Sequence, residues 1–122
     1  MRLNSFRIEA IGQVAKRPEL KTKGSTSYVN LCLIGNDWGG EGKGEIATRV
    51  FFTAFGTTAQ ALANHVCKGD QLHISAHIRD NSYQDSRTRD EVHSNSFIVD
   101  GFVFGAPGAE KREEFARTEE AA

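Results

Sequence analysis

Five segments of the chain alternate between apolar and polar residues, and this repeat of two constrains the fold more than any other feature of the sequence. In residues 6–10, for example, Phe6, Ile8 and Ala10 face one way and the charged residues between them face the other. Successive side chains of a β-strand point to opposite faces, so each segment predicts a strand with one buried and one wet face. The predicted strands span residues 6–10, 29–33, 49–55, 72–79 and 97–104. We expect the last strand to bend near Gly101.

Residues 57–67 interrupt the alternation with a run of helix-forming residues. Thr57 or Thr58 is placed to cap the start of a helix, and Lys68 in the last turn followed by Gly69 is typical of a helix end. The element order is therefore three strands, one short helix and two strands. This order is that of the OB-fold, so we predict an all-β protein with one short helix, a five-stranded OB-fold barrel with long hairpin loops.

The 122 residues suffice for one domain, and their charges nearly cancel, with 15 Lys and Arg against 16 Asp and Glu. The balance is uneven, because residues 110–122 carry five acids and three bases. We therefore predict an OB-fold domain over residues 1–105 and a short, flexible acidic tail over residues 106–122. Cys32 and Cys67 form no Cys-x-x-Cys motif and are interpreted as small, inert fillers in a protein of a reducing, cytoplasmic interior. No apolar run is long enough for a membrane span.

Motifs for catalysis are weak. The glycine-rich run at residues 39–44 lacks the spacing of a phosphate-binding loop and has glycine after Lys43. His73 and His77 share a strand face but lie about 13 Å apart, too far for one zinc ion. We therefore predict no metal, no cofactor and no enzymatic activity.

Exposed aromatic residues are the strongest functional signal. If Phe52 of the third predicted strand points into the core of the protein, then Arg49, Phe51 and Phe55 of the same strand face solvent. Exposed phenylalanines can stack on unpaired bases, and Arg49 can pair with phosphate. A protein–protein interface or packing under a loop is an equal alternative for Phe51.

Two predicted hairpin loops, residues 36–45 and 79–89, add Trp38 and Tyr83. Trp38 could instead be a core or hinge anchor, and Tyr83 an ordinary loop residue. Together, aromatic and basic residues are nevertheless expected to alternate along one face, as in a groove that binds a single strand of any sequence. They are Trp38, Lys43, Arg49, Phe55, Arg79, Tyr83 and Arg87.

The chain resembles the bacterial-type single-stranded DNA-binding proteins over most of residues 4–105. The likeness rests on segments 17–21, 29–33, 36–38, 49–56 and 68–74 in this order and spacing. The resemblance implies an OB-fold that assembles, usually as a homotetramer, and wraps single-stranded DNA without sequence preference. It also implies that Trp38, Phe55 and Tyr83 stack on bases, and that Lys21, Lys68 and Arg79 lie along the DNA path.

The chain departs from the family pattern at four places. Arg49 stands where a stacking tryptophan is common, and Val50 stands where a histidine helps assembly. The spacing from Asn30 to Trp38 is one residue short.

In the family, an acidic tip with a terminal phenylalanine recruits replication and repair enzymes, whereas this sequence stops at residues 119–122 without such a tip. Phe115, close to Glu113 and Glu114, is either a rudimentary version of the tip or part of a solvated tail. The missing tip is what we expect of a short accessory or mobile-element-encoded version.

Three hypotheses follow from the sequence. The first is a nucleoid-associated protein that binds and protects single-stranded DNA during replication, recombination, repair or DNA transfer, as a homotetramer or alternatively a dimer. The second is a dimeric OB-fold protein of the primosome or mobile-element type, which uses Phe51 and Phe55 mainly for protein partners. The third is an RNA-binding OB-fold, because stacking does not distinguish the two sugars.

Overall fold

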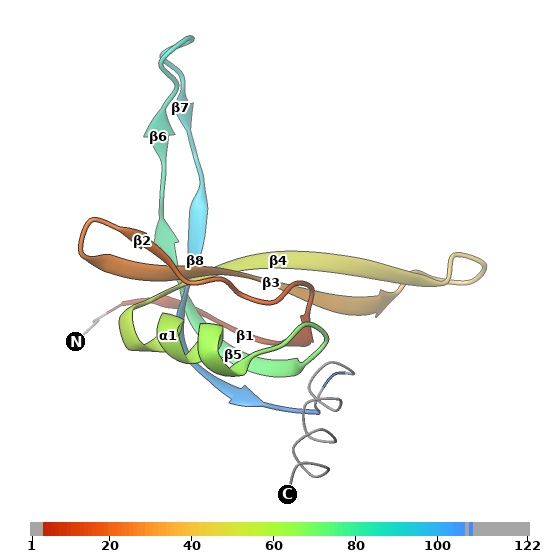
Figure 1. Ribbon diagram of the computed structural model, residues 1–122. Helices are drawn as coiled ribbons and strands as arrows, with labels where there is room; N and C mark the ends of the chain where they lie inside the picture. Colours follow the sequence, from red (N-terminus) through yellow and green to blue (C-terminus); the bar gives the residue numbers. More distant parts are fainter. Residues whose placement is uncertain (1–3, 107, 109–122) are drawn as a thin grey trace, which may run out of the picture.

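All five alternating segments form strands of one sheet in the computed structural model, which describes residues 4–106 and 108 (Figure 1). Each strand is longer than predicted, and three short strands are added. The elements are β1 (Phe6–Val14), β2 (Lys21–Lys23), β3 (Thr26–Trp38), β4 (Glu45–Phe55), α1 (Gly56–His65), β5 (Gln71–Asp80), β6 (Tyr83–Gln84), β7 (Glu91–Val92) and β8 (Asn95–Phe104). The described part of the chain holds one helix, of ten residues, and none long and apolar enough to span a bilayer.

The sheet closes on itself. Its strand order is β1-β5-β8-β4-β3-β2, and a further pairing of β1 with β3 joins Gln13 to Ile34 and Val14 to Leu33. A Cβ atom on Gly12 would lie 2.9 Å from the carbonyl oxygen of Ile34, so a glycine lets the two strands approach at the point of closure. The predicted five-stranded OB-fold barrel is confirmed, with β2 attached at its edge.

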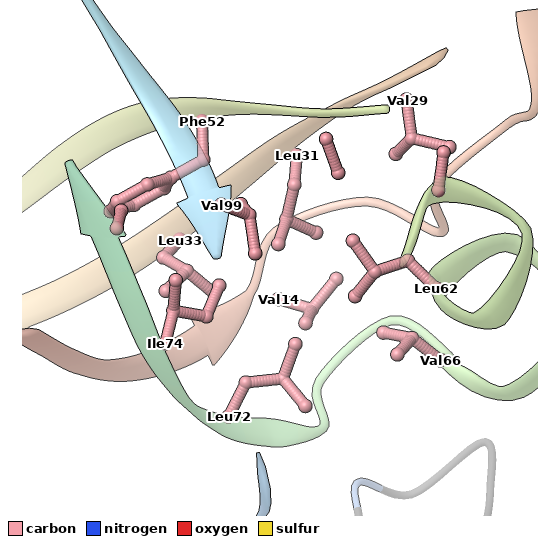
Figure 2. Close-up of a cluster of buried hydrophobic side chains, with 13 residues drawn as sticks. Val14, Val29, Leu31, Leu33, Phe52, Leu62, Val66, Leu72, Ile74 and Val99 are labelled. Atoms are coloured by element: carbon pink, nitrogen blue, oxygen red, sulfur yellow. The ribbon is translucent and has the colours of Figure 1, made fainter. Parts of the chain in front are cut away.

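The inward faces of the strands form the core, which α1 covers at one end (Figure 2). Val29, Leu31 and Leu33 of β3 are buried, as the alternation predicted. Phe52 is also buried and packs against Phe97, with 5.9 Å between the ring centroids. Because these residues must face inward, the pleat forces their neighbours on β3 and β4 to face outward.

The expectation that Phe6 faces the core is wrong, because its side chain is 78% exposed. β1 pairs with β3 only at Gln13 and Val14, so the start of β1 pairs with β5 alone and extends beyond the closed part of the barrel. The predicted bend near Gly101 is confirmed. Ser75 pairs with Gly101 and Ala76 with Val99, so Asp100 is an extra residue that bulges from β8.

The helix is present, but both predicted ends are wrong. Phe55 occupies the N-cap position because β4 runs directly into the helix, and among the described residues no side chain caps this end. The helix ends at His65, and Val66 is already extended. Lys68 and Gly69 therefore lie in the turn that leads to β5 rather than at the helix end.

The chain after β8 returns to this turn. The N–H of Gln71 donates to the carbonyl of Ala106, and the N–H of Gly108 donates to Oδ1 of Asp70. Ala106 and Gly108 are thus bonded to the barrel. The rest of the predicted acidic tail, residue 107 and residues 109–122, lies outside the described residues.

Candidate nucleic-acid interface

The outward side chains of β3 and β4 form one continuous surface. The two strands pair from Tyr28 opposite Phe55 to Trp38 opposite Glu45, and residues directly opposite each other share a face. We call this surface the β3–β4 face. It consists of Tyr28, Asn30, Cys32, Ile34, Asn36 and Trp38 from β3, and Glu45, Ala47, Arg49, Phe51, Thr53 and Phe55 from β4.

Three aromatic side chains predicted to be exposed lie on this face. The exposed fractions are 72% for Trp38, 67% for Phe51 and 42% for Phe55. Phe51 lies opposite Cys32, and Arg49 lies opposite Ile34. The predicted facing of Arg49, Phe51 and Phe55 is therefore confirmed, and it follows from the burial of Phe52 and Ala54 between them.

A shallow depression beside Phe51 collects positive charge. Its lining residues are Lys16, Arg17, Glu19, Lys21, Asn30, Cys32 and Phe51. The connection from β1 to β2 supplies the first three of these residues, and β2 supplies Lys21. Three cations and one acid thus surround an exposed aromatic ring, which is the combination that phosphate and an unpaired base require.

Phe55 separates two further depressions. The first is lined by Lys23, Thr26, Tyr28, Asn30, Thr53 and Phe55, and the second by Thr53, Phe55, Arg79, Asp80, Asn81, Ser96 and Ile98. They share Thr53 and Phe55, and the first shares Asn30 with the depression beside Phe51. The three depressions therefore form one path that crosses the strands from β5 and β8, over β4 and β3, to β2.

Four basic or aromatic residues of this path were not predicted as site residues: Lys16, Arg17, Lys23 and Tyr28. The predicted second strand began at residue 29, whereas β3 begins at Thr26. Val29 and Leu31 face the core, so the same alternation extended by one residue would have placed Tyr28 on the outer face with Asn30.

The predicted loop 36–45 is shorter than expected, because β3 continues to Trp38 and β4 already begins at Glu45. β3 and β4 continue as a hairpin that projects from the barrel, with Trp38 opposite Glu45 and a tip at residues 39–44 (Figure 1). The N–H of Gly39 donates to the carbonyl of Gly44 across this tip. Lys43 lies in the tip, so Trp38 and Lys43 extend the β3–β4 face away from the barrel.

The predicted loop 79–89 forms a second hairpin, from β6 and β7, in which Tyr83 pairs with Val92. Arg87 lies in its turn, where the backbone N–H of Arg87 donates to Oδ1 of Asp85. The two hairpins leave the barrel in different directions (Figure 1). The aromatic and basic residues that alternate in sequence therefore do not form one line in space.

At the base of the second hairpin, Asp80 lines the depression that contains Arg79. The hydroxyl and the backbone N–H of Ser82 both donate to Oδ1 of Asp80, at 2.6 and 3.0 Å, and lower the pKa of this carboxyl below its ordinary value. Asp80 is therefore a fixed negative charge beside Arg79.

Other titratable groups in residues 4–106 do not form a second centre. Lys68 lies apart from the path, in the turn between α1 and β5. His77 bonds to Asp100, with 2.9 Å between Nδ1 and Oδ1, and His73 lies 3.9 Å from Glu9. The described residues contain no group of three or more His, Cys, Asp or Glu side chains placed to hold a metal ion.

A closed five-stranded barrel with exposed aromatic rings and cations on one outer face defines an OB-fold protein of the nucleic-acid-binding class. Within that class the chain belongs to the single-strand binding protein family, whose sequence model matches residues 4–104. Proteins of this family bind DNA and are not enzymes, in agreement with the prediction from the sequence.

Two individual proteins illustrate the relationship. The single-stranded DNA-binding protein of Clostridium perfringens (strain 13 / Type A) is 32% identical over 102 aligned residues. The match covers 80% of this chain and 64% of that protein. The chain thus spans less than two thirds of the length of this relative. The crystal structure of the mitochondrial single-stranded DNA-binding protein Rim1 from S. cerevisiae superimposes with a TM-score of 0.70, over 87% of this chain and 100% of that one. Their sequence identity is 12%, so this likeness concerns the fold.

Proposed function

We propose that the chain binds single-stranded DNA without sequence preference, along the path over the β3–β4 face. The observation that carries this proposal is the placement of exposed Phe51 and Phe55 beside depressions lined by Lys16, Arg17, Lys21, Lys23 and Arg79. Rings stack on any base, and cations bind the phosphates between bases. Both contacts are indifferent to sequence, and the rings reach only bases that are unpaired.

The proposal also includes predicted residues that lie outside the three depressions. Trp38, Lys43 and Arg49 belong to the β3–β4 hairpin, and Tyr83 and Arg87 belong to the second hairpin. Lys68 stays a prediction from the resemblance alone, because it lies apart from the path. Phe51 serves DNA rather than a protein partner in this account, since three cations line the depression around it.

The proposal is tested by comparing affinities for four ligands of equal length: a single strand of thymidines, a single strand of mixed sequence, a duplex and an RNA strand. Binding of both single DNA strands within about tenfold of each other, and much weaker binding of the duplex, supports the proposal. Tightest binding of the RNA strand would favour an RNA-binding role, and tightest binding of the duplex would reject both.

We further propose that the chain assembles with copies of itself, as a homotetramer or alternatively a dimer. The outer face of β1, β5 and β8 carries a row in which Ile11 lies opposite His73 and His73 opposite Val103. Ile11 and Val103 are large apolar residues that are exposed in the single chain, and exposed apolar surface of this kind favours association. Sedimentation equilibrium tests this, and a chain that stays monomeric at tens of micromolar contradicts it.

The cellular setting is part of the same proposal. Cys32 and Cys67 carry thiols rather than a disulfide, which suits a reducing cytoplasm where the protein would meet DNA during replication, recombination, repair or transfer. Residues 1–105 would form the binding domain and residues 106–122 an acidic tail. Replication or recombination proteins would be its partners, although the sequence lacks the acidic tip with a terminal phenylalanine that recruits partners in the family.

A further inference from the structure

Tyr28 lies directly opposite Phe55, where β3 and β4 meet the edge strand β2. Tyr28 is also opposite Lys21 of β2, so Lys21, Tyr28 and Phe55 form a row across three strands on one face. Directly opposite residues have Cβ atoms roughly 4.5–5.5 Å apart, which brings the two rings close enough to bound one small site. Tyr28 is half-buried, and no role has yet been assigned to it.

We propose that Tyr28 and Phe55 are the walls of a subsite for one nucleotide of the bound single strand, an inference that rests on the proposed function. The depression they share has a volume of about 420 Å³, within the range of small-ligand sites. A base that enters it stacks on the ring of Tyr28 as well as on that of Phe55. The subsite thus places a second stacking ring beside Phe55, in a chain that has Arg49 where the resemblance implies a tryptophan.

The floor of the subsite is polar. Thr53 and Asn30 are the next opposite pair along the strands, and the hydroxyl of Thr53 donates to Oδ1 of Asn30 at 3.4 Å. With its oxygen occupied in this way, the Asn30 amide directs its N–H groups to other acceptors, such as the carbonyl groups on base edges. A floor of this kind accommodates the polar edge of a base whose faces lie against the rings.

The phosphate side of the subsite is supplied by β2. Lys23 lines the depression, and Lys21 lies beside Tyr28. A phosphate bound there belongs to the nucleotide whose base occupies the subsite or to its neighbour, since both lysines lie on the same edge strand. The lining residues thus supply all three contacts that a nucleotide offers: a stacking face, a polar edge and an anionic phosphate.

The test compares Tyr28→Leu, which keeps an apolar side chain but removes the ring, with Tyr28→Phe, which keeps the ring. Affinity is measured for a thymidine oligomer. We expect Tyr28→Leu to weaken binding by roughly 5- to 150-fold, the range for loss of one stacked base, and Tyr28→Phe to remain within about twofold of the unsubstituted protein. Phe104→Leu is the control, because Phe104 is 43% exposed, about as much as Phe55 at 42%, but lies six residues farther along β8 than Ile98, which lines the path.

A second measurement does not depend on the stability of the leucine variant. An oligomer that contains 5-iodouracil is irradiated on the unsubstituted protein, and cross-linked peptides are identified by mass spectrometry. Cross-linking at Tyr28 supports the subsite. Equal binding by Tyr28→Leu and the unsubstituted protein, or cross-links at Phe55 without any at Tyr28, would overturn it while leaving the proposed function intact. If the unsubstituted protein does not bind the oligomer at all, the proposed function itself fails.

Discussion

The backbone N–H of Gly108 donates a hydrogen bond of 2.9 Å to Oδ1 of Asp70, a residue 38 positions earlier whose side chain is completely buried. Oδ2 of the same carboxylate accepts from the N–H of Cys67 at 3.0 Å. Both oxygens are therefore satisfied by backbone donors, which makes a buried carboxylate tolerable. Asp70 therefore ties both ends of the turn between α1 and β5 to each other and to the segment after β8.

We expect Asp70→Ala to lower the free energy of unfolding by about 1–3 kcal/mol, because it leaves buried N–H groups without an acceptor. Urea denaturation followed by circular dichroism measures the change. Glu91→Gln, at an exposed position of β7, is the control and should change the free energy by less than about 0.5 kcal/mol. Equal stability of the two variants would mean that the carboxylate network does not stabilise the fold.

Gly108→Ala should also destabilise the protein. A Cβ atom at this position would lie 2.5 Å from the carbonyl carbon of Gly69, a backbone atom that cannot move aside cheaply. We expect a lower melting temperature and faster proteolytic cleavage after β8. Gly35→Ala is the matched control, since among the described residues its Cβ would meet no atom within 4 Å. An unchanged melting temperature of Gly108→Ala would contradict the close packing of Gly108 against the backbone of Gly69.

Phe55→Ala should weaken binding of a thymidine oligomer by about 1–3 kcal/mol without unfolding the barrel, because its ring is 42% exposed on the β3–β4 face. Fluorescence anisotropy of a labelled oligomer measures the affinity. Phe104→Ala removes a ring of nearly equal exposure elsewhere and should leave the affinity unchanged. If Phe55→Ala instead unfolds the protein or dissociates an assembly, Phe55 is a structural or interface residue.

Lys21→Ala and Lys23→Ala should each reduce the salt dependence of binding. A cation that neutralises one phosphate of a single strand contributes about 0.7 to the slope of log K against log salt. Each variant should therefore lose about 0.7 from this slope, whereas Lys21→Arg, which keeps the charge, should retain it. A variant that loses affinity with an unchanged slope would show that the lysine contacts something other than phosphate.

The barrel could be predicted from the sequence because the alternation of apolar and polar residues lies within each strand. Val29, Leu31 and Leu33 alternate with polar residues, and this alone fixes which side of β3 is buried and, through pairing, that Phe51 and Phe55 face outward. The ends of α1 could not be predicted in the same way. The turn after His65 is set by Asp70 and by the returning segment at Gly108, which is distant in sequence.

The candidate site could be predicted only in part, because some of its residues lie outside the long alternating strands. Residues that project from long strands, such as Phe55 and Arg79, were identified from alternation and resemblance. Tyr28 and Lys23 lie where β3 pairs with the three-residue strand β2, which is too short to leave a periodic pattern. Lys16 and Arg17 reach the depression beside Phe51 from an irregular connection, and only the folded chain brings them there.

The most direct test of the central claim is the affinity of the unsubstituted protein for a thymidine oligomer, measured by anisotropy at about 50 and about 200 mM salt. If Lys16, Arg17, Lys21, Lys23 and Arg79 all contact phosphates, the slope is roughly −3.5 per chain and the affinity falls roughly 100-fold between the two conditions. Quenching of the single tryptophan, Trp38, would report contact with the β3–β4 hairpin in the same titration. Absence of binding at the lower salt concentration, or an affinity that does not change with salt, would contradict the account.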